Sequence, residues 1–220
     1  MGAGHFQEFE DEYLEALYEF DERNPGKLVR NGELAKYLGV TPASATEMVQ
    51  RLAKNGFVEY TPYKGVSLTK KGLEHGKLMK RRHRLAEVLL SRLPFNGDIH
   101  ETACRLEHAF NDDLEACISL MLGDPKLDPS GRDIPPANNA VKQKLQSTSE
   151  FVLASKLENG QQGVIELILV NESDLQTLED FELKVNSIVE RDENGKLIIA
   201  GTTEMSENMS KRVLLRWKNE

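Results

Sequence analysis

Hydrophobic residues in the N-terminal part of the chain recur at helical spacing. Between Phe9 and Phe20 they alternate with carboxylates, which predicts an amphipathic helix that ends at Asn24-Pro25-Gly26. Residues 1–8 lack this pattern and are expected to form a disordered lead. The polar face of the predicted helix is unusually acidic.

Residues 31–57 have the pattern of a helix-turn-helix. A short helix is expected to stop at Gly39, and Thr41 with Pro42 supplies the N-cap and first position of a second helix. Two short alternating runs, 58–63 and 66–68, then predict a β-hairpin, or wing. Such a module is typical of DNA-binding proteins; the alternative is a winged helix that contacts other proteins.

The segment from Asp98 to His108 holds four side chains able to ligate a metal ion. At helical spacing they leave one side of a predicted helix that begins at Asp98; they are His100, Cys104, Glu107 and His108. We expect the same helix to carry Cys117. The preceding helical stretch, 77–93, adds His83 and Glu87 one turn apart. The alternative is a buried free cysteine beside a solvated Glu-His surface.

Beyond residue 123 the composition changes. Residues 124–140 are rich in Pro, Asp, Ser, Gly and Asn, which predicts a linker. Strand-like runs follow, with a hairpin turn at Glu193-Asn194-Gly195-Lys196, and several short strands in about seventy residues favour a small barrel. The runs are 151–157, 164–170, 187–191, 197–200 and 213–217.

Charge is unevenly distributed. The 220 residues carry a net charge of -8, but residues 26–92 carry +9 and the remainder -17. A basic block in an acidic protein predicts a local polyanion-binding surface. The two cysteines form no Cys-x-x-Cys motif, and neither an export signal nor a membrane span is recognisable, so we expect a cytoplasmic protein without membrane contact.

Together these motifs resemble the diphtheria toxin repressor family of metal-dependent transcriptional regulators. The resemblance rests on the winged helix-turn-helix, on Arg82-His83-Arg84-Leu85-Ala86-Glu87, on the 100–108 segment, and on Asp128-Pro129-Ser130-Gly131-Arg132-Asp133-Ile134-Pro135. It implies an α+β protein with an N-terminal winged helix-turn-helix, a helical dimerisation domain and a C-terminal SH3-like small β-barrel. We expect a DNA-binding domain at 1–75, a metal-binding and dimerisation domain at 76–136, a linker at 137–147 and the SH3-like domain at 148–220.

The resemblance also implies two metal sites. Cys104, Glu107 and His108 match the primary, activating site, with Glu12 at the first-helix position and Glu15 as a further carboxylate. The ancillary site matches His83, Glu87 and His100. Glu172 aligns with a glutamate that the SH3-like domain adds there, whereas Leu175 stands where a glutamine is expected.

We therefore expect a repressor in which a divalent metal is the co-repressor and orders a homodimer on a palindromic operator in double-stranded DNA. A thiolate beside carboxylates favours Fe2+, with Mn2+ second, and Co2+, Ni2+ or Zn2+ should bind in vitro. Lys64 and Arg51 are expected to contact phosphate. The second helix presents the other candidate DNA contacts: Thr41, Ala43, Ser44, Thr46, Glu47 and Gln50.

Two alternatives remain open. A metalloenzyme with Glu107 as base would leave the basic winged helix unexplained, and the chain has no His-Glu-x-x-His motif. A metal-independent winged-helix regulator would make the His and Cys positions vestigial. We predict that the protein is not an enzyme.

Overall fold

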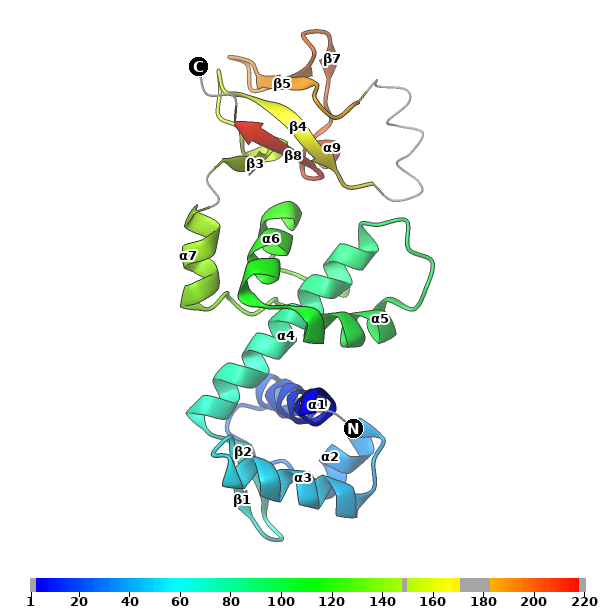
Figure 1. Ribbon diagram of the computed structural model, residues 1–220, viewed down its shortest axis with the longest axis vertical. Coiled ribbons are helices and arrows are strands. Elements are labelled where there is room, and N and C mark those ends of the chain that lie inside the picture. Colours follow the sequence, from blue (N-terminus) through cyan, green and yellow to red (C-terminus); the bar gives the residue numbers. More distant parts are fainter. Residues whose placement is uncertain (1–2, 148–149, 171–182, 218–220) are drawn as a thin grey trace. The chain divides into compact units, whose positions relative to one another are not determined.

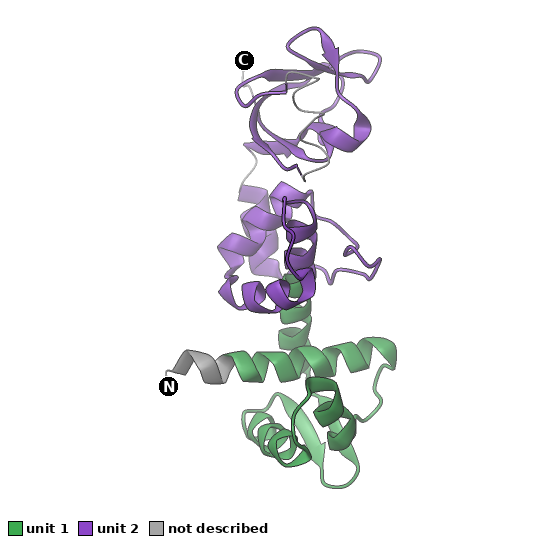
Figure 2. Ribbon diagram, turned by 90° about the vertical axis from the view of Figure 1, so that its right-hand side faces the viewer, with its two compact units in different colours: residues 1–83 green, residues 84–220 purple. Residues whose placement is uncertain are grey.

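The computed structural model describes residues 3–147, 150–170 and 183–217, with side chains from residue 8 onward. The chain divides into two compact units, residues 1–83 and 84–220, each of which is described by itself (Figure 2). The division falls inside one uninterrupted helix, α4 (Lys70–Ser91).

The first unit is a winged helix-turn-helix preceded by a long helix (Figure 1). The helix α1 already begins at Ala3, so the expectation of a disordered lead is wrong for residues 3–8. Six leucine and valine side chains and Ala45 form the fully buried centre of this unit. The elements are α1 (Ala3–Arg23), α2 (Asn31–Leu38), α3 (Pro42–Lys54), β1 (Val58–Thr61), β2 (Gly65–Leu68) and the start of α4.

The turn residues act as the sequence predicts. Gly39 closes α2 in a left-handed conformation with φ 67°, and the Thr41 hydroxyl accepts a hydrogen bond from the Ser44 backbone N–H at 3.1 Å. The strands β1 and β2 pair antiparallel, with Val58 opposite Leu68. The predicted wing is therefore present.

Two glycines let α4 lie close to the rest of this unit. A Cβ atom at Gly72 would stand 1.9 Å from the Phe57 carbonyl oxygen, and one at Gly76 would stand 2.4 Å from the Leu14 carbonyl oxygen. Side chains at either position would push α4 away from the wing or from α1.

In the second unit, the segment that the sequence predicted as one helix carrying Cys104 and Cys117 is divided. The helix α5 (Ile99–Leu106) passes into a 3-10 turn, η1 (Glu107–Ala109), and α6 (Asp112–Leu122) then starts anew. Asn111 causes the break, because its side chain accepts the Leu114 N–H at 2.8 Å and caps α6. Cys104 and Cys117 consequently lie on different helices, which corrects the expectation that one helix carries both.

A helix also occupies most of the linker expected at 137–147. The helix α7 (Asn139–Ser147) packs on α6, and its Val141 is fully buried. Asn138 caps it by accepting the Val141 N–H at 2.8 Å. Asn138, the cap, lies in the stretch 124–140 that is rich in Pro, Asp, Ser, Gly and Asn, so its composition hid the start of the helix. Within α7, all of which the structure describes, Val141 is the one apolar side chain that is buried.

The C-terminal part is a six-stranded antiparallel sheet in the order β3-β8-β4-β5-β6-β7, which confirms the predicted small barrel (Figure 1). The predicted turn between β5 and β6 has Gly195 at φ 82°, and Asp192 accepts the backbone N–H groups of Asn194 and Lys196. The elements are β3 (Phe151–Leu153), η2 (Ala154–Lys156), β4 (Gln162–Ile168), β5 (Ile188–Arg191), β6 (Leu197–Ile199), β7 (Thr203–Glu204), α9 (Glu207–Ser210) and β8 (Val213–Trp217).

The barrel and the helices of the second unit share apolar contacts. Leu169 is buried in the same cluster as Leu85 and Phe110. Gly123, which ends α6, lies so close to the barrel that a Cβ there would be 2.4 Å from Cδ1 of Leu153. These contacts fix the barrel against the end of α6.

Candidate metal centre and nucleic-acid interface

Carboxylates on α1 face cations on α4 within the first unit. Asp11, Glu15 and Glu19 recur every fourth residue and so share one side of α1. The Lys80 ammonium is 2.8 Å from Oε1 of Glu15 and 2.6 Å from Oε2 of Glu19. The ring of His75 lies 2.5 Å from Asp11. We call this set of side chains the α1/α4 seam.

Charge pairing shifts the proton affinities in the seam. Burial alone raises the pKa of Glu19, but the Lys80 hydrogen bond and charge outweigh it and lower that pKa to about 2. Burial and the hydrogen bond to Glu19 raise the pKa of Tyr37 to about 12. Burial lowers the pKa of Lys80, but Glu15 and Glu19 more than compensate, so that pKa is raised.

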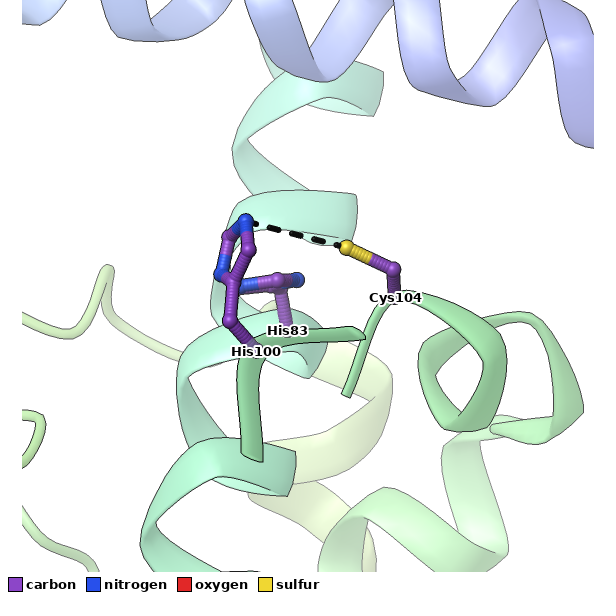
Figure 3. Close-up of side chains that lie close together, drawn as sticks. All are labelled: His83, His100 and Cys104. Carbon is purple, nitrogen blue, oxygen red and sulfur yellow. Dashed lines mark hydrogen bonds between the residues drawn. The ribbon is translucent and has the colours of Figure 1, made fainter. Parts of the chain in front are cut away.

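Metal-competent side chains meet where α4 crosses α5. His83, the last residue of the first unit, lies one turn before Glu87 on the continuous α4. Its ring approaches His100 and Cys104 of α5, and one donor atom from each of the three lies within 4.8 Å of the others (Figure 3). Cys104 Sγ is 4.0 Å from Nε2 of His100. We call His83, His100 and Cys104 the soft-donor cluster.

Glu87 supports this cluster from one side. Its Oε1 lies 3.2 Å from Nδ1 of His100, while Oε2 accepts a 2.8 Å hydrogen bond from Arg132. Arg132 is in turn held by Asp128, whose Oδ2 is 2.5 Å from Nε. The loop containing Asp128 thus places a cation against one of the predicted ancillary ligands, a contact between residues 45 apart that no local pattern signals.

Glu107 and His108 follow the end of α5, whereas His100 and Cys104 lie within it. They belong to η1, not to α5, so the expectation that all four donors leave one helix on one side is wrong. Glu107 is 1% exposed, whereas the His100 side chain is 68% exposed. The His108 Nε2 atom lies 3.6 Å from Glu107 Oε1.

The soft-donor cluster fits a transition metal. Metal–nitrogen bonds of about 2.0–2.1 Å and metal–sulfur bonds of about 2.3 Å place donors up to roughly 4.4 Å apart. The donor atoms lie within 4.8 Å of one another, and Cys104 Sγ is 4.0 Å from His100 Nε2, so one ion could be bound after small side-chain rotations. Two imidazoles and a thiol suit Fe2+, Co2+ or Zn2+ better than Mg2+ or Ca2+.

Glu12 and Glu15 lie on different sides of α1. Glu15 Oε1 is 3.8 Å from Nδ1 of His83, so this carboxylate faces α4. Glu12 instead borders a hollow with Leu38, Val40 and Met48, on the side of α2 and α3. The predicted Glu172 lies outside the described residues.

A groove lies between α3 and the wing. It has a volume of about 460 Å³ and brings the predicted residues Thr46, Gln50 and Lys64 together. Sequence reasoning missed the other polar side chains of its wall, Arg30, Asn31, Tyr60 and Tyr63. Tyr63 is fully exposed at the wing tip with φ 66°. Its position beside Lys64 in the turn was the signal available in the sequence.

Other predicted DNA contacts on α3 already have partners. The Thr46 hydroxyl donates to the Pro42 carbonyl and accepts from Asn31. The Thr41 and Ser44 hydroxyls lie 2.8 Å apart at the N-cap. Arg51 pairs with Glu10 of α1 at 2.8 Å. Ala43 and Glu47 are exposed and available to a ligand.

Two domain families match more than half of the chain. Residues 5–66 match the family described as "Iron dependent repressor, N-terminal DNA binding domain", and residues 69–136 match "Iron dependent repressor, metal binding and dimerisation domain". An uncharacterised HTH-type transcriptional regulator of Methanocaldococcus jannaschii is 38% identical over 108 residues, which cover 47% of this chain and 84% of that protein. The chain belongs to the iron-dependent repressor family.

Further relatives of this family member carry functional names. The diphtheria toxin repressor of Corynebacterium glutamicum is 28% identical over 181 residues, covering 81% of this chain and 78% of that protein. The iron-dependent repressor IdeR of Mycobacterium bovis is 30% identical over 126 residues, covering 56% of this chain and 54% of that protein.

A solved structure supports the fold over nearly the whole chain. A manganese-dependent transcriptional repressor in complex with manganese superposes with a TM-score of 0.53 and 23% identity, covering 95% of this chain and 100% of that one. This likeness confirms the predicted fold class, including the C-terminal barrel.

Family membership decides several predictions. The chain is a transcriptional repressor with a DNA-binding domain and a metal-binding and dimerisation domain, and the prediction that it is not an enzyme is confirmed, because this family consists of repressors. The ligand assignment and the identity of the ion are separate questions. In the part of the chain that the structure describes, no helix has the length and apolar character of a membrane span.

Proposed function

We propose that this protein is an Fe2+-activated repressor, in which metal binding favours the DNA-competent arrangement of a homodimer on a palindromic operator. The observation that carries the proposal is the soft-donor cluster, in which His83 of α4 meets His100 and Cys104 of α5. The domain limits 1–75, 76–136 and 148–220 and a cytoplasmic location remain part of this proposal, whereas the segment 137–147, expected as a linker, contains α7.

The ligands divide into two sets. We assign His83, His100 and Cys104 to one ion, with Glu87 beside His100 as a further ligand. For the activating ion we retain Glu107 and His108, which adjoin each other, together with a carboxylate from α1. Glu12 is the α1 residue implied by the family resemblance, whereas the 3.8 Å approach of Glu15 to His83 favours Glu15.

The choice of ion follows from the donors. A thiolate and imidazoles favour Fe2+ over Mn2+, and the carboxylates Glu87 and Glu107 tolerate both. Relatives named as iron-dependent and a structural neighbour with manganese leave both ions in the family. Co2+, Ni2+ and Zn2+ should bind in vitro because raw affinity follows the Irving–Williams order.

In this mechanism, the side chains that bind the metal restrict the position of α4. A bound divalent ion supplies positive charge that anionic donors on different elements can share. His83 would hold such an ion together with donors on α5, and the first part of α4 packs beside the wing at Gly72 and against α1 at Gly76. Only a difference in affinity between the two arrangements shifts their populations, and a coupling of about 1–3 kcal/mol is the usual range.

DNA recognition would use the α3/wing groove. Lys64, Arg30 and Arg51 are suited to phosphate, and Gln50, Thr46, Ser44 and Thr41 can hydrogen bond to base edges or phosphate. Ala43 can touch a thymine methyl, and Glu47 can accept from cytosine. A two-fold dimer reading a palindrome requires a second copy of the same groove.

The test starts with selection of bound duplexes from a random pool in anaerobic Fe2+. Fluorescence anisotropy then measures affinity for the selected duplex with Fe2+, with Mn2+ and with chelator. We expect binding about tenfold or more tighter with Fe2+ than with chelator, within the usual coupling range. Equal affinity in all three conditions contradicts the proposal.

Cysteine variants provide a matched pair. Cys104→Ala should abolish most of the metal effect, because it removes the thiolate donor of the cluster. Cys117→Ala changes the chain's other cysteine, which is exposed on α6, and should leave the metal effect intact. Equal responses of the two variants would exclude Cys104 as a ligand.

Glu12→Gln and Glu15→Gln decide the α1 ligand. Both substitutions remove one charge from the same helix without changing size, and the residue whose change reduces metal-dependent DNA binding more is the ligand. Because Glu15 also pairs with Lys80, its folded state is checked by thermal unfolding without metal. If neither variant alters the response, α1 contributes no ligand.

A further inference from the structure

A large cavity lies within the second unit, where the end of α4 and α6 meet the barrel. Its volume is about 670 Å³, within the usual range of about 300–1000 Å³ for small-molecule sites. Contacts described above hold the two walls together, because Leu169 joins the helical core and Gly123 abuts Leu153. None of the residues of the DNA groove or the soft-donor cluster lines it.

The cavity wall is rich in cations. Arg92 directly follows the end of α4, Lys156 comes from η2 and Arg191 from β5, and Lys196 and Lys211 lie at other points of the wall. The lysines at 196 and 211 are paired with Glu204 and Glu207 at 2.6 and 2.8 Å. Those pairs cancel, which leaves an excess of three positive charges in an otherwise acidic protein.

The three remaining cations have no carboxylate partner among the described residues. Arg92 donates to the Leu122 carbonyl at 2.9 Å. Arg191 donates to the carbonyls of Gly195 and Ser155 at 2.7 and 3.3 Å, and its buried Nε has no acceptor. Lys156 is exposed and makes no hydrogen bond within the described chain. Backbone carbonyls hold the two guanidinium groups in place without neutralising them.

Electrostatics makes this arrangement costly without an anion. Burial and the nearby positive charge of Arg212 both lower the pKa of Arg92, which means that its charged form is destabilised where it stands. A bound anion would reverse that effect.

We propose that this cavity binds a small non-aromatic polyanion, held by Arg92, Lys156 and Arg191. Three negative charges would balance the three cations, and planar guanidinium groups suit phosphate or carboxylate oxygens. Among the residues that the structure describes, none on the wall is aromatic and able to stack on a base or ring; the apolar residues there are Leu122, Pro125, Leu153, Leu197 and Met205. The site is independent of the proposed metal and DNA functions.

Isothermal titration of the full-length chain with pyrophosphate and with citrate tests the proposal, and acetate serves as the singly charged control. Metal-free buffer is required because both probes chelate divalent ions. We expect pyrophosphate or citrate to bind with a Kd below about 1 mM, and the tighter probe identifies phosphate or carboxylate chemistry. Failure of both probes to bind at that concentration overturns the proposal.

Charge reversals locate the binding. Lys156→Glu should weaken the better probe by about tenfold or more, because it removes one cation and adds an anion in the cavity. Lys142→Glu makes the same change on the exposed face of α7, outside the cavity, and should have less than about a twofold effect. Both lysines are exposed, so both variants should fold. Equal weakening by the two substitutions would mean general charge attraction and would overturn the proposal.

Arg92→Lys provides a second check. It keeps the charge but loses the planar fork, so we expect weaker binding with an unchanged number of sites. The probe should also raise the thermal unfolding midpoint of the wild type more than that of Lys156→Glu. Unaltered affinity in Arg92→Lys together with equal midpoint shifts contradicts the assignment.

Discussion

The α1/α4 seam and the soft-donor cluster are two neighbouring uses of α4, and they differ in where the positive charge comes from. In the seam Lys80 itself lies between Glu15 and Glu19, so the cation is part of the chain. In the cluster His83, His100 and Cys104 supply only neutral or anionic donors. Glu15 and Glu19 of the seam are paired with a lysine of the same chain, so they stabilise the fold whether or not metal is present. The cluster stabilises the fold only when a metal ion binds.

The largest expected effect is from removing the built-in cation. Lys80→Met leaves two buried carboxylates facing each other, so the free energy of unfolding should fall by about 3 kcal/mol. Denaturant unfolding at pH 7 measures it. Lys36→Met, which changes an exposed lysine on α2, is the control and should cost less than about 0.5 kcal/mol. Equal losses would mean that the seam has no special role.

Metal should stabilise the cluster by a comparable amount. At a free Fe2+ concentration 100 times Kd, the free energy of unfolding should rise by about 2.7 kcal/mol. His100→Ala should lose most of this gain, because it removes a donor whose side chain is 68% exposed and contributes little to the core. Glu101→Ala, the adjacent exposed residue, is the control. A full metal response in His100→Ala would exclude the cluster.

The sequence predicted those features that local signals determine. Gly39, Thr41 and Pro42 located the helix-turn-helix, and Asn194-Gly195 located a barrel turn. The pattern of His100, Cys104, Glu107 and His108 identified metal-competent residues but not their grouping. The apolar periodicity continues through residues 107–110, so nothing local signalled that η1 would bury Glu107 and leave His100 exposed.

The sequence also did not predict ion pairs and hydrogen bonds between residues that are far apart along the chain. Lys80 read as one more residue of a basic block, yet it is 3% exposed and pairs with carboxylates more than sixty residues away. Arg132 was part of a loop motif, and its hydrogen bond to Glu87 depends on how that loop folds back. Such pairings follow from tertiary packing, which helical or strand periodicity does not encode.

Arg132 combines features of the seam and the cluster, because it places a cation of the chain beside Glu87, which is a proposed metal ligand. Arg132→Gln should lower the free energy of unfolding without metal by about 1.5 kcal/mol, the value of a charged hydrogen bond. It should also tighten Fe2+ binding by about fivefold, since Glu87 loses a competing positive charge. Arg105→Gln, on the exposed face of α5, is the control. Weaker metal binding in Arg132→Gln would show that Arg132 positions Glu87 for the ion.

The smallest effect concerns Tyr37, which donates a 2.9 Å hydrogen bond to Glu19. Tyr37→Phe should cost about 1 kcal/mol at pH 7. The Glu19 pKa of about 2 lies below its usual 4.5, so stability from this carboxylate is present above pH 4.5 and is lost as the pH falls toward 2. The difference between wild type and variant should therefore shrink across that window.

Alkaline pH provides an opposite check on the same hydrogen bond. The Tyr37 pKa is raised from 10.0 to about 12, so its contribution is complete below pH 10 and is lost as the pH rises to 12. Tyr37→Phe has no phenol to ionise, and its unfolding free energy should be flatter than that of the wild type over this range. Parallel curves for the two proteins from pH 10 to 12 would mean that the phenol–carboxylate contact does not stabilise the seam. The stabilising partners of Glu19 would then be Lys80 and Arg23.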